Sequence, residues 1–354
     1  MRSGEGRTAS LMFAAVFSVM CAYYMVKPLR EGWIATSAIA GLSRVEIKAY
    51  SSLIQSLLLI GAVGAYARLA ARWSQRLLIA RTVSVCVAML VGFWLLQPGF
   101  LVEALPGLGI VFYLWVGIFG VCIVAQFWAF ATDLYADDRG RRLIPLIAIG
   151  GTAGAAAGSW LHGWLTSFGA AGSQSVLLLA AVPLAAAAAL SRSAAERPVP
   201  ARAPSTTVVP NLRRVVGDRF VLAAGMLALL LSWASTNGEN LLFQVVQEGI
   251  ARTAGSGLDA ASTLARSRAT IAFYGDFYFW TNLTALVAQL LLTSRLLRRG
   301  GLAAIIFALP LLALLASAVV ALAPALAILK WVKVAEQATD YSLNQTARQV
   351  LWLP

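Results

Sequence analysis

Charged residues are scarce in this sequence. Asp, Glu, Lys and Arg together account for 12% of its 354 residues, whereas hydrophobic residues account for 60%. The mean hydropathy is +0.77. Soluble domains carry about 25% charged residues. The composition therefore excludes an ordinary soluble domain and predicts an integral membrane protein.

Histidine and cysteine are also rare. His162 is the only histidine, which excludes a histidine metal cluster, and we expect it to be an interfacial side chain near the outer end of an apolar segment. The three cysteines, Cys21, Cys86 and Cys122, lie in apolar segments without a CxxC spacing, so neither a disulfide framework nor a thiolate metal site is expected. Because P-loop, Rossmann and HExxH motifs are lacking too, we expect no cofactor and no enzymatic activity.

Long apolar runs dominate the sequence instead. Crossing about 30 Å of hydrocarbon takes about 20 residues of helix. Ten such segments are predicted, at residues 9–31, 47–71, 77–97, 106–132, 143–166, 174–191, 219–244, 270–293, 302–322 and 325–347. The fold class is thus all-α and integral to the membrane. The run GWIATSAIAGL after Arg30 either lengthens the first helix or forms a re-entrant piece.

The basic residues indicate orientation. The formal net charge is +13, but Lys and Arg are spread over short connections, which argues against nucleic acid as a partner and for the lipid bilayer. On one side of the predicted bundle lie 19 of the 28 basic residues, namely Arg2, Arg7, Arg68, Arg72, Arg76, Arg81, Arg139, Arg141, Arg142, Arg192, Arg197, Arg202, Arg213, Arg214, Arg219, Arg295, Arg298, Arg299 and Arg348. This side is predicted to be cytoplasmic, with the N-terminus inside and the protein multi-pass in the inner membrane.

The chain contains an internal repeat. The tripeptide ATD begins at Ala131 and again at Ala338, at the predicted cytoplasmic ends of the fourth and tenth helices, and each copy continues through arginine to a proline. The region 191–218 is rich in Pro, Ser, Thr and Arg and has no apolar periodicity, so it is predicted to be a cytoplasmic linker. We therefore divide the chain into a six-helix half at 1–190, the linker, and the first four helices of a second half at 219–354.

This organisation is similar to that of major-facilitator transporters, in which two six-helix halves rock around a central site. The comparison implies a 6 + 4 arrangement of an expected 6 + 6. We accordingly expect the sequence to be truncated after the tenth helix, at Pro354. A soluble partner domain is a further possibility for the missing C-terminal portion.

Ionisable residues inside the predicted helices are the candidates for a binding site, because burying a charge in hydrocarbon is costly unless it faces a cavity or a partner. In the tenth helix Lys330, Lys333, Glu336 and Asp340 follow a spacing of three, three and four residues, which places them on one face. They are predicted to line a central cavity, the alternative being internal ion pairs that serve packing. The seventh helix adds Glu239 and Asn240, in the stretch STNGENLLFQ.

The stretch AYYMVKPLREGW places three charges around Pro28. In a structural interpretation Lys27 pairs with Glu31 one turn later, Arg30 extends to the outer headgroups, and Pro28 ends the helix. In a binding interpretation Lys27 and Arg30 face the cavity and attract phosphate, Arg by bidentate geometry and Lys as a point charge.

Three further patterns have mainly structural interpretations. Tyr274, Asp276, Tyr278 and Asn282 form an aromatic face that either stacks a base or anchors at the outer interface, and we favour the interface. Asp133 either belongs with Gln126 and Trp128 to the functional polar residues of the fourth helix or is a helix-end partner for Arg139 or Arg141. The stripe of Gly150, Gly154 and Gly158 predicts close helix packing.

Several motifs resemble the ATP/ADP-translocase family of nucleotide transporters, known from plastids and intracellular bacteria. YYMVKPLREGW is similar to that family's first-helix signature at Lys27, Arg30 and Glu31, and QFWAFATDLY to its fourth-helix signature. DYSLNQTARQVLWLP is similar to the family's tenth-helix ending, through Tyr341, Ser342, Leu343, Arg348 and Pro354. Asp340 stands where members that exchange ATP for ADP have lysine, which argues against that exchange but not against the fold; Lys330 and Lys333 are candidates to supply the lost charge.

The sequence thus predicts a secondary transporter for an anionic solute, with a nucleotide or related phosphate compound implied by the resemblance. Two alternatives stay open. One is a proton-coupled carrier of another solute, with Glu239 or Asp340 as the protonatable group. The other is a membrane sensor or anchor that keeps the transporter fold without transport.

Overall fold

A computed structural model describes residues 5–98, 100, 105, 107–135, 138–194, 219–254, 260–291, 311, 312, 314, 315, 318 and 326–344. These residues are almost entirely helical, which confirms the predicted all-α fold. The elements are α1 (Glu5–Ile34), α2 (Arg44–Arg72), α3 (Gln75–Leu96), α4 (Leu108–Leu134), α5 (Asp138–Thr166), α6 (Gly169–Ala194), α8 (Arg219–Ala254), α9 (Ala260–Leu291), α11 (Leu326–Thr339) and the π-helical turn η1 (Asp340–Asn344). Most of the predicted 302–322 helix and of the 191–218 linker lies outside the described residues, as do Arg348 and Pro354.

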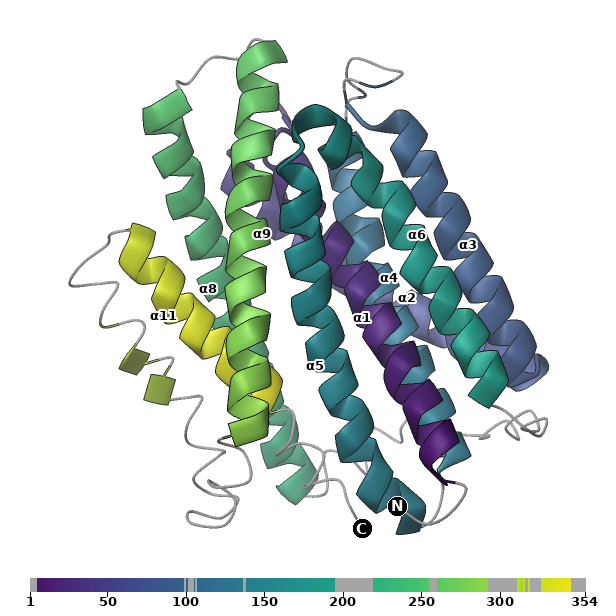
Figure 1. Ribbon diagram of the computed structural model, residues 1–354. Helices are drawn as coiled ribbons and strands as arrows, with labels where there is room; N and C mark the ends of the chain where they lie inside the picture. Colours follow the sequence, from purple (N-terminus) through teal and green to yellow (C-terminus); the bar gives the residue numbers. More distant parts are fainter. Residues whose placement is uncertain are drawn as a thin grey trace.

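Six of the described helices are long and apolar enough to cross a membrane. They cover Gly6–Ile34, Arg44–Arg72, Leu77–Leu96, Leu108–Leu134, Leu143–Thr166 and Gly169–Ala194. Each overlaps a segment predicted from hydropathy. In Figure 1, α8, α9 and α11 lie beside the group formed by α1 to α6, and α5 and α9 run next to each other along the seam.

Helix α1 is the central element. It packs against α4, α5, α6 and α9, and its residues 21–34 are all buried except Tyr23. The helix is apolar around most of its circumference, as expected for a helix with neighbours on every side. It continues through Pro28 to Ile34. The structural interpretation in which Pro28 ends the helix was wrong, and GWI lengthens the helix rather than forming a re-entrant piece.

The glycine stripe on α5 lets α1 approach closely, as predicted. A Cβ added at Gly154 would lie 2.1 Å from the carbonyl oxygen of Phe17, and one at Gly158 would lie 2.3 Å from that of Cys21. Any side chain at these positions would force the two backbones apart. Small residues at this spacing are a common solution for tight helix packing in membranes.

The seam between α5 and α9 is polar as well as close. Thr152 donates to Gln289 at 2.6 Å, and Asn282 donates to the Ser159 hydroxyl at 3.1 Å. Hydrogen bonds between buried side chains satisfy groups that lipid could not. These hydrogen bonds join α9 to α5.

Two interfacial predictions were wrong. His162 is fully buried, its Nδ1 lies 2.7 Å from the carbonyl oxygen of Met25, and its ring contacts Gly275. Tyr274 and Tyr278 are each 2% exposed and belong to the core. Hydropathy and position along a helix do not reveal which neighbour covers a side chain, and here α1, α5 and α9 meet where lipid headgroups were expected.

Replacing Gly154 by Ala should destabilise the protein. The new methyl group would collide with the Phe17 carbonyl, and overpacking of this kind typically costs about 1–3 kcal/mol. Gly163→Ala on the same helix is the matched control, because a Cβ there has no atom within 4 Å. Thermal unfolding of the purified variants in detergent measures the difference, and equal midpoints for the two variants would contradict the packing argument.

Candidate functional site

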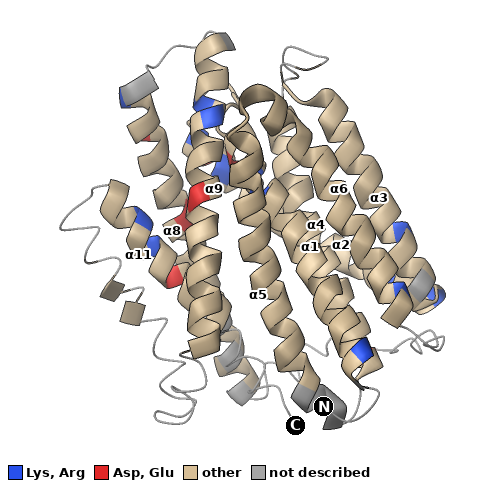
Figure 2. Ribbon diagram, in the orientation of Figure 1, with Lys and Arg blue, Asp and Glu red and all other residues tan. Residues whose placement is uncertain are grey.

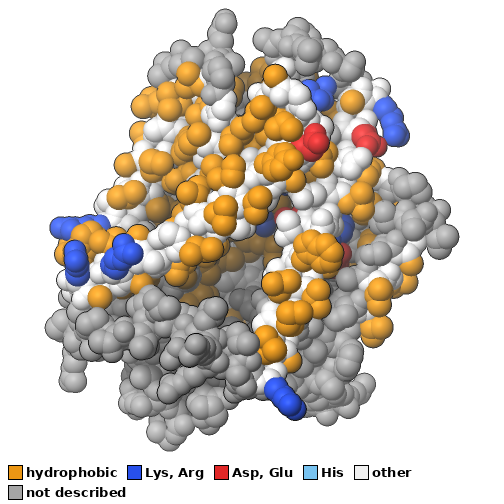
Figure 3. Space-filling view, turned by 180° about the vertical axis from the view of Figure 1, so that it is seen from behind, with side chains coloured by type: hydrophobic (Ala, Val, Ile, Leu, Met, Phe, Trp, Pro, Cys, Tyr) orange, Lys and Arg blue, Asp and Glu red, His pale blue; other side chains and the backbone are white. Residues whose placement is uncertain are grey.

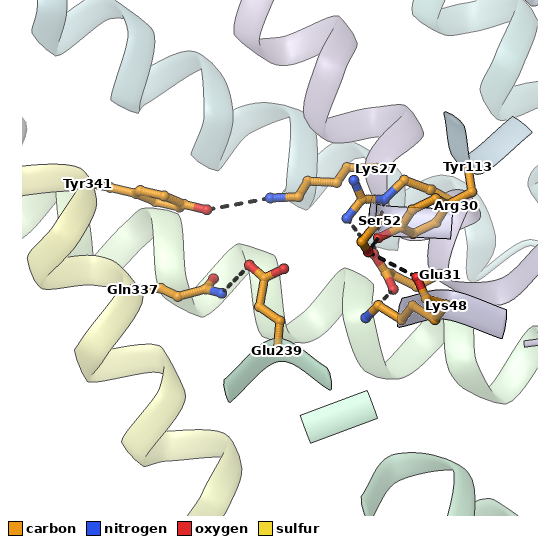
Figure 4. A network of polar contacts seen from close by, with 9 residues as sticks. All are labelled: Lys27, Arg30, Glu31, Lys48, Ser52, Tyr113, Glu239, Gln337 and Tyr341. Carbon is orange, nitrogen blue, oxygen red and sulfur yellow. Dashed lines mark hydrogen bonds and ion pairs between the residues drawn. The ribbon is translucent and has the colours of Figure 1, made fainter. Parts of the chain in front are cut away.

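Polar side chains gather at the seam between α1 and α2 on one side and α8 and α11 on the other. Figure 2 shows charge largely absent along most helices but present where α8, α9 and α11 face α1. The central network consists of Lys27, Arg30, Glu31, Lys48, Ser52, Tyr113, Glu239, Gln337 and Tyr341 (Figure 4). Seen from behind, the surface is hollowed at its middle, and basic and acidic side chains are visible in the hollow (Figure 3).

Glu31 is the centre of a buried ion triad. Its Oε1 accepts from Arg30 Nε at 3.0 Å and from Arg30 Nη2 at 2.5 Å, and its Oε2 lies 2.9 Å from Lys48 Nζ. All three side chains are buried. The structural interpretation of these charges was wrong on two points, since Glu31 pairs with Arg30 and Lys48 rather than with Lys27. Arg30 is enclosed over the ring of Tyr113, at 4.6 Å, and does not extend to headgroups.

Lys48 was not among the residues predicted to form the site. It lies in the second turn of α2, just after a capping box formed by Ser43 and Glu46, where a lysine would normally be assigned to the membrane surface. In the structure it is 2% exposed, and its ammonium lies 4.5 Å from the ring centre of Phe243 on α8. The available signal was a lysine followed directly by the long apolar part of its own helix. Its partner Glu31 is on another helix, so the pair could not be read from the spacing.

Lys27 is a buried cation in an aromatic enclosure. Its ammonium lies 4.2, 5.0, 5.8 and 5.9 Å from the ring centres of Tyr278, Tyr24, Tyr23 and Tyr341. It also donates to the Tyr341 hydroxyl at 3.4 Å, across the seam. Within the described part of the chain, no carboxylate forms an ion pair with it. Aromatic faces attract a cation, but they leave its charge uncompensated.

The charged residues of α11 are largely paired. Lys333 contacts Glu336 at 2.7 Å one turn along the helix, and Lys330 forms an ion pair with Asp276 of α9. Lys333 also lies against Gly238, because a Cβ there would come 2.3 Å from its ammonium. Each of these lysines is therefore paired with a carboxylate. This pairing argues against the hypothesis that they supply the positive charge that is missing at Asp340.

The remaining predicted residues lie on the α8 and α11 side of the seam. Glu239 accepts from Gln337 Nε2 at 3.0 Å and points into the network (Figure 4). Asn240 is partly buried beside it. Asp340 is also partly buried and begins η1, a π-helical turn of the kind often found at functional sites.

Asp133 accepts a hydrogen bond from another helix. Gln75 of α3 donates to its carboxylate at 3.1 Å. The side chains of Arg139 and Arg141, which were the expected partners, lie outside the described residues. Asp133 thus joins α3 to α4 near the end of the bundle that holds the N-terminus.

No protein-family model matches the chain, and no curated protein matches it. Among solved structures, the nucleoside transporter NupG has a TM-score of 0.57 at 14% identity, covering 97% of this chain and 82% of that one. A bacterial homologue of the human lysosomal transporter Spinster, inward-facing and unoccupied, has a TM-score of 0.51 at 14% identity, with 98% and 76% covered. The xylose transporter XylE from E. coli, partially occluded and inward open, has a TM-score of 0.51 at 16% identity, with 98% and 84% covered.

Identities this low show the fold alone. The chain shares the major-facilitator-type fold of these structures, all of which are transporters, and six of its described helices are long and apolar enough to cross a membrane. The comparisons single out no specific family within that fold.

Glu31→Gln should strongly destabilise the protein. The variant keeps the shape of the side chain but leaves Arg30 and Lys48 buried without their carboxylate, and breaking a buried pair costs about 3–5 kcal/mol. Adding Lys48→Met should recover part of the loss, because it removes one of the two uncompensated cations.

The effects of Lys27→Gln and Glu31→Gln on the unfolding midpoint should instead be additive, because Lys27 forms no ion pair with Glu31. Unfolding midpoints of the single and double variants measure the recovery by Lys48→Met and the additivity with Lys27→Gln. A non-additive effect of Lys27→Gln and Glu31→Gln would contradict the conclusion that Glu31 pairs with Arg30 and Lys48 rather than with Lys27.

Proposed function

We propose that this protein is a secondary transporter that moves a small anionic solute across the membrane by alternating access. The observation that carries the proposal is Lys27, a buried cation at the seam with no carboxylate partner among the described residues. Holding an unpaired ion away from water costs several kcal/mol. A bound anion would remove that cost, so the site gains stability when a substrate of negative charge enters it.

The balance of charge near Lys27 supports a bound anion, because the cations of the central network outnumber its two carboxylates, Glu31 and Glu239. Lys27, Arg30 and Lys48 contribute three cations, and Glu31 is the carboxylate that contacts two of them. The lysines of α11 are each matched by a carboxylate. The excess of positive charge therefore lies on the α1 and α2 side, and a phosphate group would be attracted there.

A nucleotide or a related phosphate compound is the substrate class that we propose. This proposal rests on the resemblance of two motifs, one in α1 and one at residues 340–354, to those of the nucleotide transporters. In this assignment Lys27 and Arg30 contact the phosphate, while Glu239, Asn240, Lys333 and Glu336 line the opposite side. Lys330 and Asp340 complete the proposed lining at the two ends of the α11 stripe.

A proton-coupled carrier is the second candidate, and Glu239 favours it. The Glu239 carboxylate accepts a hydrogen bond from the neutral amide of Gln337. Within the described residues Glu239 forms no ion pair. A carboxylate in such surroundings can take up a proton without breaking a salt bridge. Protonation of Glu239 would then accompany movement of the solute.

Lys27→Gln should weaken substrate binding without preventing insertion. Loss of one charged hydrogen bond to phosphate costs about 1.5–3 kcal/mol, or roughly a ten- to hundredfold loss of affinity. Counterflow of labelled nucleotides in proteoliposomes measures the effect. Arg252→Gln is the control, because Arg252 has a side-chain exposure of 79% at the far end of α8. Wild-type affinity in the Lys27 variant would remove the anion site from α1.

Glu239→Gln separates the two candidates. If transport is coupled to protons, wild-type uptake is saturable, collapses with an uncoupler and ignores added nucleotides. The variant, unable to release a proton at this position, should then lose uptake driven by a pH gradient while retaining exchange. If nucleotide exchange is the activity, uncoupler should have no effect on wild type, and that result would exclude proton coupling through Glu239.

A further inference from the structure

A second concave site lies away from the polar network, between α5, the start of α6 and α9. This groove has a volume of about 630 Å³ and is lined by Trp160, Trp164, Ser167, Arg268, Ile271 and Phe279, among others. The turn between α5 and α6, which borders the groove, lies at the end of the bundle opposite the N-terminus (Figure 1). Neither Lys27 nor any member of the Glu31 triad lines the groove.

The candidate membrane spans indicate the depth of the groove. The candidate span of α5 ends at Thr166 and that of α6 begins at Gly169, so the turn between them is expected at the membrane surface. Both residues line the groove, and so does Ser159. With a rise of 1.5 Å per residue, Ser159 lies about 10 Å deeper than Thr166. The groove therefore extends along about two turns of α5, enough for a lipid phosphate at one end and the first part of an acyl chain at the other.

Its walls are apolar and its outer end is basic. Trp160 and Trp164 are 56% and 48% exposed and stack on each other, as tryptophans do at the interface of a bilayer. Arg268 is exposed, and in the described part of the chain no carboxylate forms an ion pair with it. The carboxylate of Asp276 also lines the groove, but it is paired with Lys330.

We propose that this groove binds one anionic phospholipid. The phosphate contacts Arg268, and an acyl chain lies along Trp160, Ile271 and Phe279. A groove that opens sideways into the bilayer is filled by lipid rather than by water, because water is scarce at that depth. The unpaired guanidinium then selects a lipid with net negative charge, since guanidinium matches phosphate in geometry as well as in charge.

The test is lipid binding to the purified protein, measured by native mass spectrometry with dioleoyl phosphatidylglycerol and dioleoyl phosphatidylcholine. Wild type should retain phosphatidylglycerol more tightly than phosphatidylcholine. Arg268→Gln should lose roughly tenfold in affinity for phosphatidylglycerol and bind the two lipids alike. Arg252→Gln, an exposed arginine on α8 paired with Glu248, should keep the wild-type preference. An Arg268 variant that still prefers phosphatidylglycerol would overturn the proposal.

A second variant tests the groove from its other wall. Gly163 lines the groove, and a Cβ there meets no atom within 4 Å, so Gly163→Phe should fill the space without disturbing the helices. It should reduce binding of both lipids, whereas Gly61→Phe on α2, where a Cβ is equally unobstructed, should not. Unchanged lipid binding in Gly163→Phe would overturn the proposal. Displacement of phosphatidylglycerol by inorganic phosphate would do so too, because it would assign Arg268 to a free anion.

Discussion

The uneven balance of buried charge beside α1 is the constraint on which this structure depends. Three cations, Lys27, Arg30 and Lys48, are buried with one carboxylate, Glu31, that pairs with two of them. In a bilayer such groups persist only if they face partners or a cavity that admits an anion. The triad holds Arg30 and Lys48 in place, and Lys27 is left facing the seam, so the same arrangement that stabilises α1 also creates the proposed anion site.

The packing of α1 is what keeps these charges out of lipid. Glycines on α5 allow its backbone to lie against α1, and α4, α6 and α9 cover its other sides. Close packing of this kind buries residues 21–34 almost completely and excludes lipid from Lys27. The glycine stripe carries no charge, but the close packing that it allows keeps the charged side chains of α1 away from lipid.

The helices were predictable because hydropathy is a local property. The segment predicted at 77–97 is observed as Gln75–Leu96, and the glycine stripe was correctly assigned to packing. Partners were not predictable, because they come from other helices. The alternative that paired Lys27 with Glu31 used the one-turn spacing within α1, whereas Lys48 on α2 is the partner that folding provides. His162 and Tyr278 were assigned to the interface for the same reason, as sequence position gives depth but not which neighbour covers a residue.

The strength of the contacts across the seam suits a protein whose two groups of helices move relative to each other. The ion triad lies entirely within α1 and α2, so it can persist while the seam opens. Contacts from Lys27 and Lys48 to α8, α9 and η1 are instead cation–π interactions and one long hydrogen bond, and each cation–π contact contributes only about 0.5–2 kcal/mol. The hydrogen bonds between α5 and α9 add about 1 kcal/mol each. In the proposed transporter, the binding energy of an anion that contacts Lys27 would exceed any one of these contributions and would shift the balance between the closed and open arrangements of the two helix groups.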